Sequence, residues 1–332
     1  QNVAVGANAL DANTTASNNV AVGHDALSAN TTGSQNVAVG QKALEANTTA
    51  SNNTAVGLVA LTLNTTGASN TALGKGALSA NTTASNNTAV GFHALDLNTT
   101  GGNNVAVGKD ALLSNTGSFS NVAIGTRALD AFNVTTATST YNVAIGEDAL
   151  GACTTGTQNT AVGGEALFDH TTGSENTALG YRALYNNTTA GANTGLGHST
   201  LFNTTTGANN VAIGQGAMYI NSTGTLNVAV GNASLGLNTT GANNVAVGIG
   251  AGYENTTGSS NTYIGDDAGD TTTTGSSNTL VGANVLTVSA GTSNANGFGL
   301  NLTCSDNYTT IGQGTSDCRN AHGEATWATA TF

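Results

Sequence analysis

One seventeen-residue pattern recurs along most of this chain, and a fixed repeat of that length constrains the fold more than any single residue does. The stretch NVAVGANALDANTTASN is followed by NVAVGHDALSANTTGSQ and then by NVAVGQKALEANTTASN. The chain contains seventeen copies, and each begins with a five-residue segment that ends in glycine, from Gly6 to Gly282. Fifteen of the sixteen intervals between successive glycines are seventeen residues long. The interval from Gly125 to Gly146 carries four extra residues, which we interpret as an insertion near 131–141 that loops out of one coil.

The chemistry of the repeat predicts short strands that stack. In N-V-A-V-G the outer two aliphatic residues point to one face and the alanine to the other, as in a β-strand. The following A-L segment is interpreted as a second short strand with its leucine inward, and N-T-T as a turn. Glycine at the corner supplies positive φ without steric cost. Stacked coils then bury a column of Val, Ile, Leu and Ala that one coil alone leaves exposed.

We therefore predict an all-β fold, a β-solenoid (parallel β-roll or β-helix) of about seventeen 17-residue coils. Length alone would suggest two or three domains, but the repeat favours one rod over residues 1–282. Residues 283–332 lose the repeat and are predicted to form a C-terminal cap or assembly segment, with a possible degenerate strand at Tyr308–Gly312.

An asparagine starts the strand in all seventeen copies. In a stack, each side-chain amide is able to donate to the carbonyl of the one below, which satisfies a buried polar group. We predict a structural asparagine ladder that includes Asn2, Asn19, Asn36, Asn53, Asn70, Asn87 and Asn104.

Charge excludes several partners. The net charge is −12 with only six basic residues, whereas nucleic acid and anionic membranes require clustered Lys or Arg. Five of the six basic residues follow the corner glycine, which indicates a solvent-facing turn. No apolar stretch is long enough for a membrane span, and no signal peptide is visible, so Gln1 would be a processed end if the protein is exported.

The N-T-T turn creates Asn-x-Ser/Thr sequons in the same position of many coils. One interpretation is a line of glycans along an edge of the rod. The other is that Asn and Thr are good turn residues and create sequons by chance. The ten candidate glycosylation sites in this position are Asn13, Asn30, Asn47, Asn64, Asn81, Asn98, Asn187, Asn221, Asn238 and Asn255.

Three cysteines are present. Cys304 and Cys318 lie together in the tail and are a candidate disulfide, with two free thiols as the alternative. Cys153 occupies a position that is usually Asn, and we expect a small buried residue there instead of a nucleophile.

No constellation for catalysis is recognisable: the histidines are scattered, and the acids lie mainly in the turn after the glycine. Asp266 and Asp267 are a pair of acids of the kind that binds Ca²⁺ weakly, but the Gly-Gly-x-Gly-x-Asp repeat of calcium β-rolls is missing. We therefore expect no catalytic residues, no metal site, no cofactor and no enzymatic activity.

The strands N-V-A-V-G, N-T-A-L-G and N-V-A-I-G resemble the head repeats of trimeric autotransporter adhesins. That resemblance covers some 280 residues, and it implies a parallel β-roll that associates as trimers. The repeat here is longer than in that family, and neither a heptad stalk nor a membrane-anchor barrel is visible.

These observations predict an extracellular or cell-surface protein that is a structural subunit of a fibre, assembles with itself head to tail, and carries glycans on the N-T-T turns. The first alternative is an adhesin head module, trimeric in form, that binds a host or carbohydrate surface. A lesser alternative is an ice-binding solenoid, because flat arrays of outward Thr order water. Adjacent Thr residues of a strand point to opposite faces, however, which disfavours it.

Overall fold

The computed structural model describes residues 1–314, 316–324 and 328–330. The chain divides into two compact units, residues 1–172 and 173–332, and each is a parallel β-solenoid. The predicted fold class is therefore confirmed.

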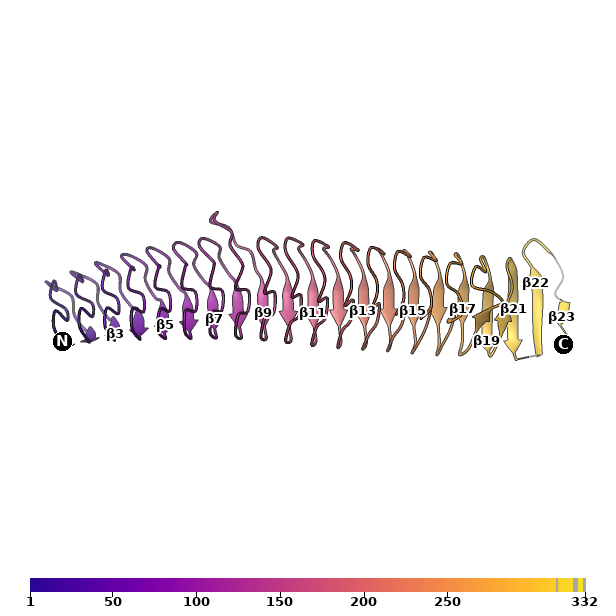
Figure 1. Cartoon of the computed structure of the whole chain (residues 1–332), viewed down its shortest axis with the longest axis horizontal. Coiled ribbons are helices and arrows are strands. Elements are labelled where there is room, and N and C mark those ends of the chain that lie inside the picture. Colours follow the sequence, from indigo (N-terminus) through magenta and orange to yellow (C-terminus); the bar gives the residue numbers. More distant parts are fainter. Residues whose placement is uncertain (315, 325–327, 331–332) are drawn as a thin grey trace. The chain divides into compact units, whose positions relative to one another are not determined.

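The first unit contains ten three-residue strands that pair in parallel, each with the next (Figure 1). Paired residues are seventeen apart, as in Val3↔Val20. The exception is Val122↔Val143, where the predicted insertion projects as a loop (Figure 1). The strands are β1 (Val3–Val5), β2 (Val20–Val22), β3 (Val37–Val39), β4 (Thr54–Val56), β5 (Thr71–Leu73), β6 (Thr88–Val90), β7 (Val105–Val107), β8 (Val122–Ile124), β9 (Val143–Ile145) and β10 (Thr160–Val162).

The second unit repeats this arrangement and then departs from it. Its parallel coils comprise β11 (Thr177–Leu179), β12 (Thr194–Leu196), β13 (Val211–Ile213), β14 (Val228–Val230), β15 (Val245–Val247), β16 (Thr262–Ile264), β17 (Thr279–Val281) and β19 (Asn296–Leu300). The strands outside this series are β18 (Leu286–Thr287), β20 (Thr303–Cys304), β21 (Tyr308–Gln313), β22 (Ser316–Ala321) and β23 (Ala328–Ala330).

The repeat register continues past the last corner glycine of the sequence pattern. Thr279 in β17 pairs with Asn296 in β19, again seventeen residues on. Strand β21 covers the predicted strand Tyr308–Gly312 and pairs in parallel with β19. Strand β22 pairs with β21 in the antiparallel sense, so the solenoid ends in a hairpin.

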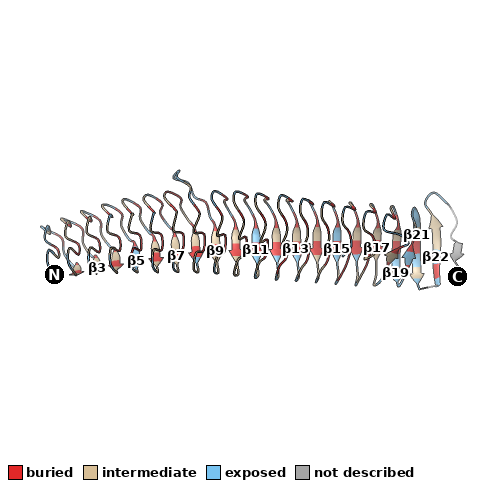
Figure 2. Ribbon diagram, in the orientation of Figure 1, coloured by how far each residue is buried: buried red, intermediate tan, exposed pale blue. Residues whose placement is uncertain are grey.

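The strands have the predicted alternation, and Ala and Leu are buried as expected, but Val and Ile, which we expected in the same buried column, are not. In most strands only the central residue is buried, as Figure 2 shows in red. Ala21 is fully buried, whereas its neighbours Val20 and Val22 are only half-buried. The column of Val, Ile and Leu at the outer strand positions therefore lies on the outside of the solenoid, and the core contains Ala and Leu.

In the first sixteen coils the predicted second strand is absent, and this part of the prediction was wrong for them. In the seventeenth coil the segment does form a strand, β18, which pairs in parallel with β20. In the other coils the A-L segment forms turns, in which Leu27 and Leu44 both have φ near +53°. Such left-handed backbone is unfavourable for a leucine. It curls the chain so tightly that both leucines are nevertheless fully buried, as predicted. Burial of each side chain offsets the strain, since it contributes about 2 kcal/mol.

Core volume is conserved between neighbouring coils of the second unit. Tyr263 replaces the usual core alanine and is fully buried. Gly252 and Gly269 replace the core leucine in two adjacent coils, and a Cβ at Gly252 would lie 2.5 Å from the Tyr263 ring. One large side chain thus fills the space that two leucines leave, as close packing requires.

Candidate functional site

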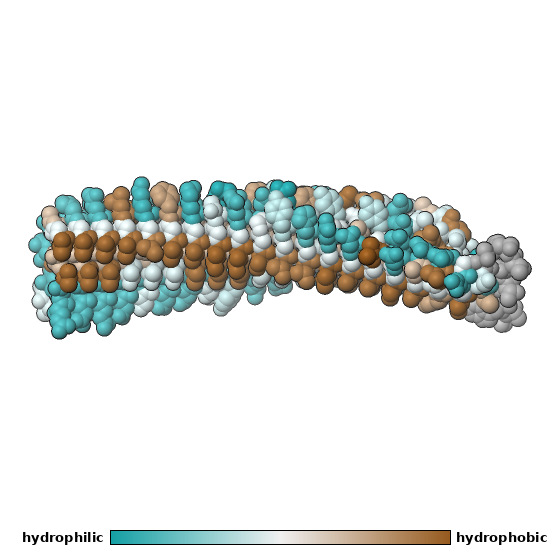
Figure 3. Space-filling model, turned by 90° about the horizontal axis from the view of Figure 1, so that it is seen from below, coloured by the Kyte–Doolittle hydropathy of each residue, from teal (hydrophilic) through white to brown (hydrophobic). Residues whose placement is uncertain are grey.

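The outer face of the sheet is the most unusual surface of each unit. Each strand of the first unit presents two outward residues, and together they form two continuous columns, which we call the outer sheet stripe (Figure 3). Every member is Val, Thr, Leu or Ile. The stripe comprises Val3, Val5, Val20, Val22, Val37, Val39, Thr54, Val56, Thr71, Leu73, Thr88, Val90, Val105, Val107, Val122, Ile124, Val143, Ile145, Thr160 and Val162.

The stripe is accessible and uncharged. Leu73 is 47% exposed and Ile124 is 37% exposed. A row of polar side chains borders the outer sheet stripe. These residues, such as Asn52 and Asn86, directly precede the buried ladder asparagine of each coil. The second unit carries an equivalent pair of columns, in which Leu179 and Leu196 are exposed. A contiguous apolar patch with a polar border is typical of an interaction surface.

The predicted asparagine ladder is confirmed, although its hydrogen bonds differ from those expected. Asn19 is buried, and its Oδ1 accepts a hydrogen bond from the backbone N–H of Asn36 at 2.9 Å. Its Nδ2 donates to the carbonyl of Gly33 in the same coil, at 2.9 Å. The side chain therefore joins one coil to the next and also closes its own coil. The same pair of bonds recurs at Asn36, Asn53, Asn70, Asn87 and Asn104.

The sequon asparagines form a second buried ladder, which sequence reasoning missed. Asn47 donates from Nδ2 to Oδ1 of Asn30 at 2.9 Å, and Asn64 donates to Asn47 at 3.0 Å. All ten candidate glycosylation sites except the half-buried Asn13 are fully buried. A glycan on Nδ2 would remove this donor and has no space in the core. The folded protein therefore does not present these sites as a line along its surface, contrary to our expectation.

The candidate disulfide is not formed, because Cys304 and Cys318 are both free. Cys304 is buried. In β22, alternation turns Asp317 inward and leaves Cys318 exposed. Cys304 lies in β20, which belongs to a separate two-stranded sheet with β18. Cys153 is buried in the second ladder position, as expected, with its Sγ 3.8 Å from the Gly156 carbonyl.

We expect only one of the three thiols to react with iodoacetamide in the native protein. Burial raises the pKa of Cys153 to about 12 and that of Cys304 to about 11, so neither is a thiolate near neutral pH. Mass spectrometry should show one adduct, at Cys318, before unfolding and three after unfolding. A native mass that rises by two hydrogens on reduction would contradict free thiols.

Titratable side chains lie mostly in the turns after the corner glycine, as expected. Lys42 pairs with Glu45 at 3.0 Å and Lys109 with Asp110 at 2.6 Å. His170 differs, since it is fully buried in the position of the second ladder. Among the described residues, no three His, Cys, Asp or Glu side chains are grouped closely enough to hold a metal ion.

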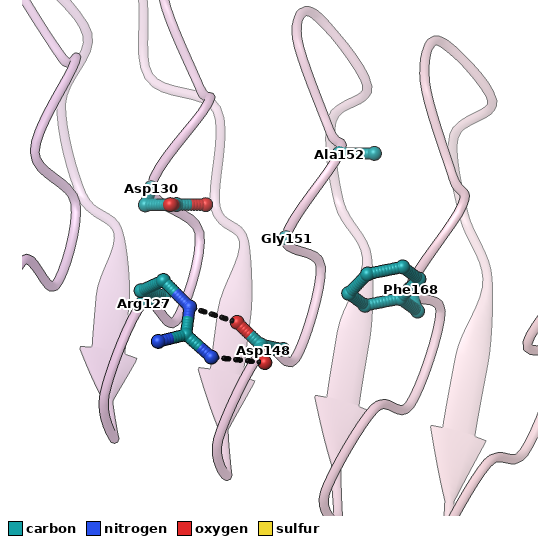
Figure 4. Close-up of a pocket in the computed structure, with 6 residues that line it drawn as sticks. All are labelled: Arg127, Asp130, Asp148, Gly151, Ala152 and Phe168. Atoms are coloured by element: carbon teal, nitrogen blue, oxygen red, sulfur yellow. Dashed lines mark hydrogen bonds and ion pairs between the residues drawn. The ribbon is translucent and has the colours of Figure 1, made fainter.

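A shallow pocket of about 260 Å³ opens on the surface of the first unit (Figure 4). Its lower wall is the ion pair of Arg127 and Asp148, in which Nε donates to Oδ1 at 2.7 Å and one terminal nitrogen donates to Oδ2 at 2.6 Å. Asp130 lines one side and Phe168 the other. Burial and the nearby charge of Asp148 raise the pKa of Asp130.

Comparisons with known proteins return no match, whether against family models, curated proteins or solved structures. Within the part of the chain that the structure describes, no helix has the length and apolar character needed to cross a bilayer.

Proposed function

We propose that this chain is a structural subunit of an extracellular surface fibre and that copies pack against one another through the outer sheet stripe. The observation that carries this proposal is the uncharged stripe of Val, Thr, Leu and Ile on the outside of the solenoid. A stripe without charge is complementary to itself, because no like charges oppose one another when two copies meet.

The size of the stripe supports a second copy as its occupant. Ten strands at about 4.8 Å give a length of about 48 Å, and two outward residues give a width of about 10 Å. The resulting area is roughly 500 Å² on each copy, or roughly 1,000 Å² for a pair, which is near the lower limit for a specific interface. Sheets that face each other pack at about 10 Å, a separation that short β-branched side chains fill well.

The resemblance to the head repeats of trimeric autotransporter adhesins supports association between copies, since it implies that such chains assemble as trimers. Head-to-tail contact is a further part of the proposal. Successive coils of the first unit are joined by the same pattern of asparagine and backbone hydrogen bonds, as at Asn36, Asn53 and Asn70, so a coil of another copy in the same register is a competent partner. A location outside the cell follows from the proposed role.

The test is to place charge on the stripe. We expect V56K combined with V90K to weaken assembly at least about 100-fold, because two buried unpaired charges cost several kcal/mol. Sedimentation velocity and negative-stain microscopy of the purified chain measure the change. The matched control is N52K with N86K, in the same coils but on the polar border, where Lys42 already shows that lysine tolerates left-handed backbone.

Long filaments in the wild type that the stripe variant loses and the control keeps would support the proposal. A wild type that sediments as a monomer at high concentration would refute it, and so would filaments that form equally well with both variants. Discrete short particles that adhere to carbohydrate would favour the adhesin alternative.

The ice-binding alternative has less support. Hydroxyl groups in one of the two Thr columns of the N-T-T turns donate to carbonyls of the next coil, as Thr31 does to Thr48 at 3.0 Å and Thr65 to Thr82 at 3.0 Å. These hydroxyl groups are committed to the fold and do not form a free array toward water.

A further inference from the structure

The pocket of the first unit exists because one coil departs from the repeat. The position after the core leucine carries a side chain in the preceding coils, for example Leu113 and Asp130. Gly151 occupies it in the next coil and leaves a gap one side chain wide. In the coil after that the same position is Phe168, and a Cβ added at Gly151 would lie 3.6 Å from the Phe168 ring. Gly151 is therefore the floor of a hollow with an aromatic wall.

The polar groups of the pocket are mainly hydrogen-bond acceptors. Arg127 neutralises Asp148 through two hydrogen bonds. Asp130, by contrast, forms no ion pair within 4.0 Å among the described residues, and Figure 4 shows its carboxylate beside the hollow. A ligand that fits must therefore bring hydroxyl or amine donors for the carboxylates together with an apolar face for Phe168.

The ionised side chain of Asp130 also lowers the stability of the native state. Burial and the negative charge of Asp148 raise its pKa, although Arg127 acts in the opposite direction. A folded-state pKa above the unfolded value means that the ionised carboxylate destabilises the native state at neutral pH. Acidic residues that have a perturbed pKa and do not stabilise the fold are more common at functional sites than elsewhere.

We propose that this pocket binds one pyranose ring of a neutral glycan. Vicinal hydroxyl groups of the sugar donate to Asp130 and Asp148, and the apolar C–H face of the ring packs on Phe168. The volume of about 260 Å³ lies just below the usual range for small-molecule sites, so it suits one sugar unit. A glycan with an acidic sugar is disfavoured because Asp130 would repel it. The proposal does not depend on assembly through the outer sheet stripe.

The experiment uses saturation-transfer NMR on the full chain with the methyl glycosides of glucose, galactose and mannose as probes, and with glucuronate and butylamine as comparisons. We expect at least one neutral glycoside to bind at millimolar concentration. Substitution D130N should weaken that binding at least tenfold, since a hydrogen bond to a charged group is lost, while the melting temperature stays equal or rises.

Substitution G151L fills the hollow and should abolish binding. Leucine is tolerated in this position, since Leu113 occupies it two coils earlier. The matched control is S28L, which places the same residue in the same position of a distant coil and should leave binding unchanged. Circular dichroism establishes that each variant is folded.

Absence of binding by all three neutral glycosides would overturn the proposal. Binding that survives G151L unchanged would place the sugar elsewhere and would also overturn it. Butylamine that displaces the glycoside and binds more tightly would identify a site for cations instead of sugars.

Discussion

Replacing Gly57 by alanine is expected to destabilise the first unit by about 4 kcal/mol or more, a loss that few single substitutions produce. Gly57 has φ +140°, a region that residues with a Cβ avoid. An added Cβ would lie 2.5 Å from the carbonyl oxygen of Gly74 and 2.6 Å from its carbonyl carbon. Because Gly74 is itself a corner held against the next coil, relief of the clash requires separation of two coils along the stack.

Urea unfolding followed by circular dichroism measures this loss. The control is G76A in the same unit, at φ +71°, where the nearest atoms belong to the flexible side chain of His93 at 3.2 Å. Asp25 and Lys42 adopt similar backbone in this position of other coils, so G76A should cost only about 1 kcal/mol. Equal losses for G57A and G76A would show that close approach of the coils does not decide the effect.

Removal of one ladder side chain should have the second large effect. In N70A, the backbone N–H of Asn87 loses the Oδ1 of Asn70, which accepts its hydrogen bond at 3.0 Å in the wild type. The carbonyl of Ala84 loses one of its two donors, at 2.9 Å, and keeps the hydrogen bond from Asn81 Nδ2 at 3.0 Å. The unpaired N–H of Asn87 costs about 1–3 kcal/mol, and the lost side chain adds a cavity. We expect a loss of about 2–4 kcal/mol in the free energy of unfolding.

The control for this experiment is T83A, because Thr83 is exposed and its side chain makes no hydrogen bond within the described part of the chain. It should change stability by less than about 0.5 kcal/mol. Faster amide exchange at Asn87 in N70A would locate the defect. A variant N70A as stable as T83A would mean that water satisfies the N–H of Asn87 and that the ladder contributes little.

Some of the site was visible in the sequence and some was not. The ladder from Asn2 to Asn104 was predictable, because a buried polar residue at a fixed interval requires a partner in the next coil. The second ladder was hidden, because the same Asn-Thr-Thr letters satisfy both a glycosylation sequon and a buried turn. The pocket at Gly151 was equally hidden, since a glycine in one variable position signals a gap only when its neighbours in space are known.

The amino-acid order by itself determined the period of the solenoid, its parallel register and the positions of its corner glycines, because these follow from local chemistry repeated every seventeen residues. Tertiary structure alone decided which face of each strand is buried. Alternation separates Ala from Val without saying which is inside. Left-handed leucines such as Leu27 curl the coil tightly, so a coil that has this leucine usually has alanine beneath its strand, and the larger Val and Ile side chains are left on the outer surface. Tyr263 fits in the alanine position where Gly252 and Gly269 replace the leucine.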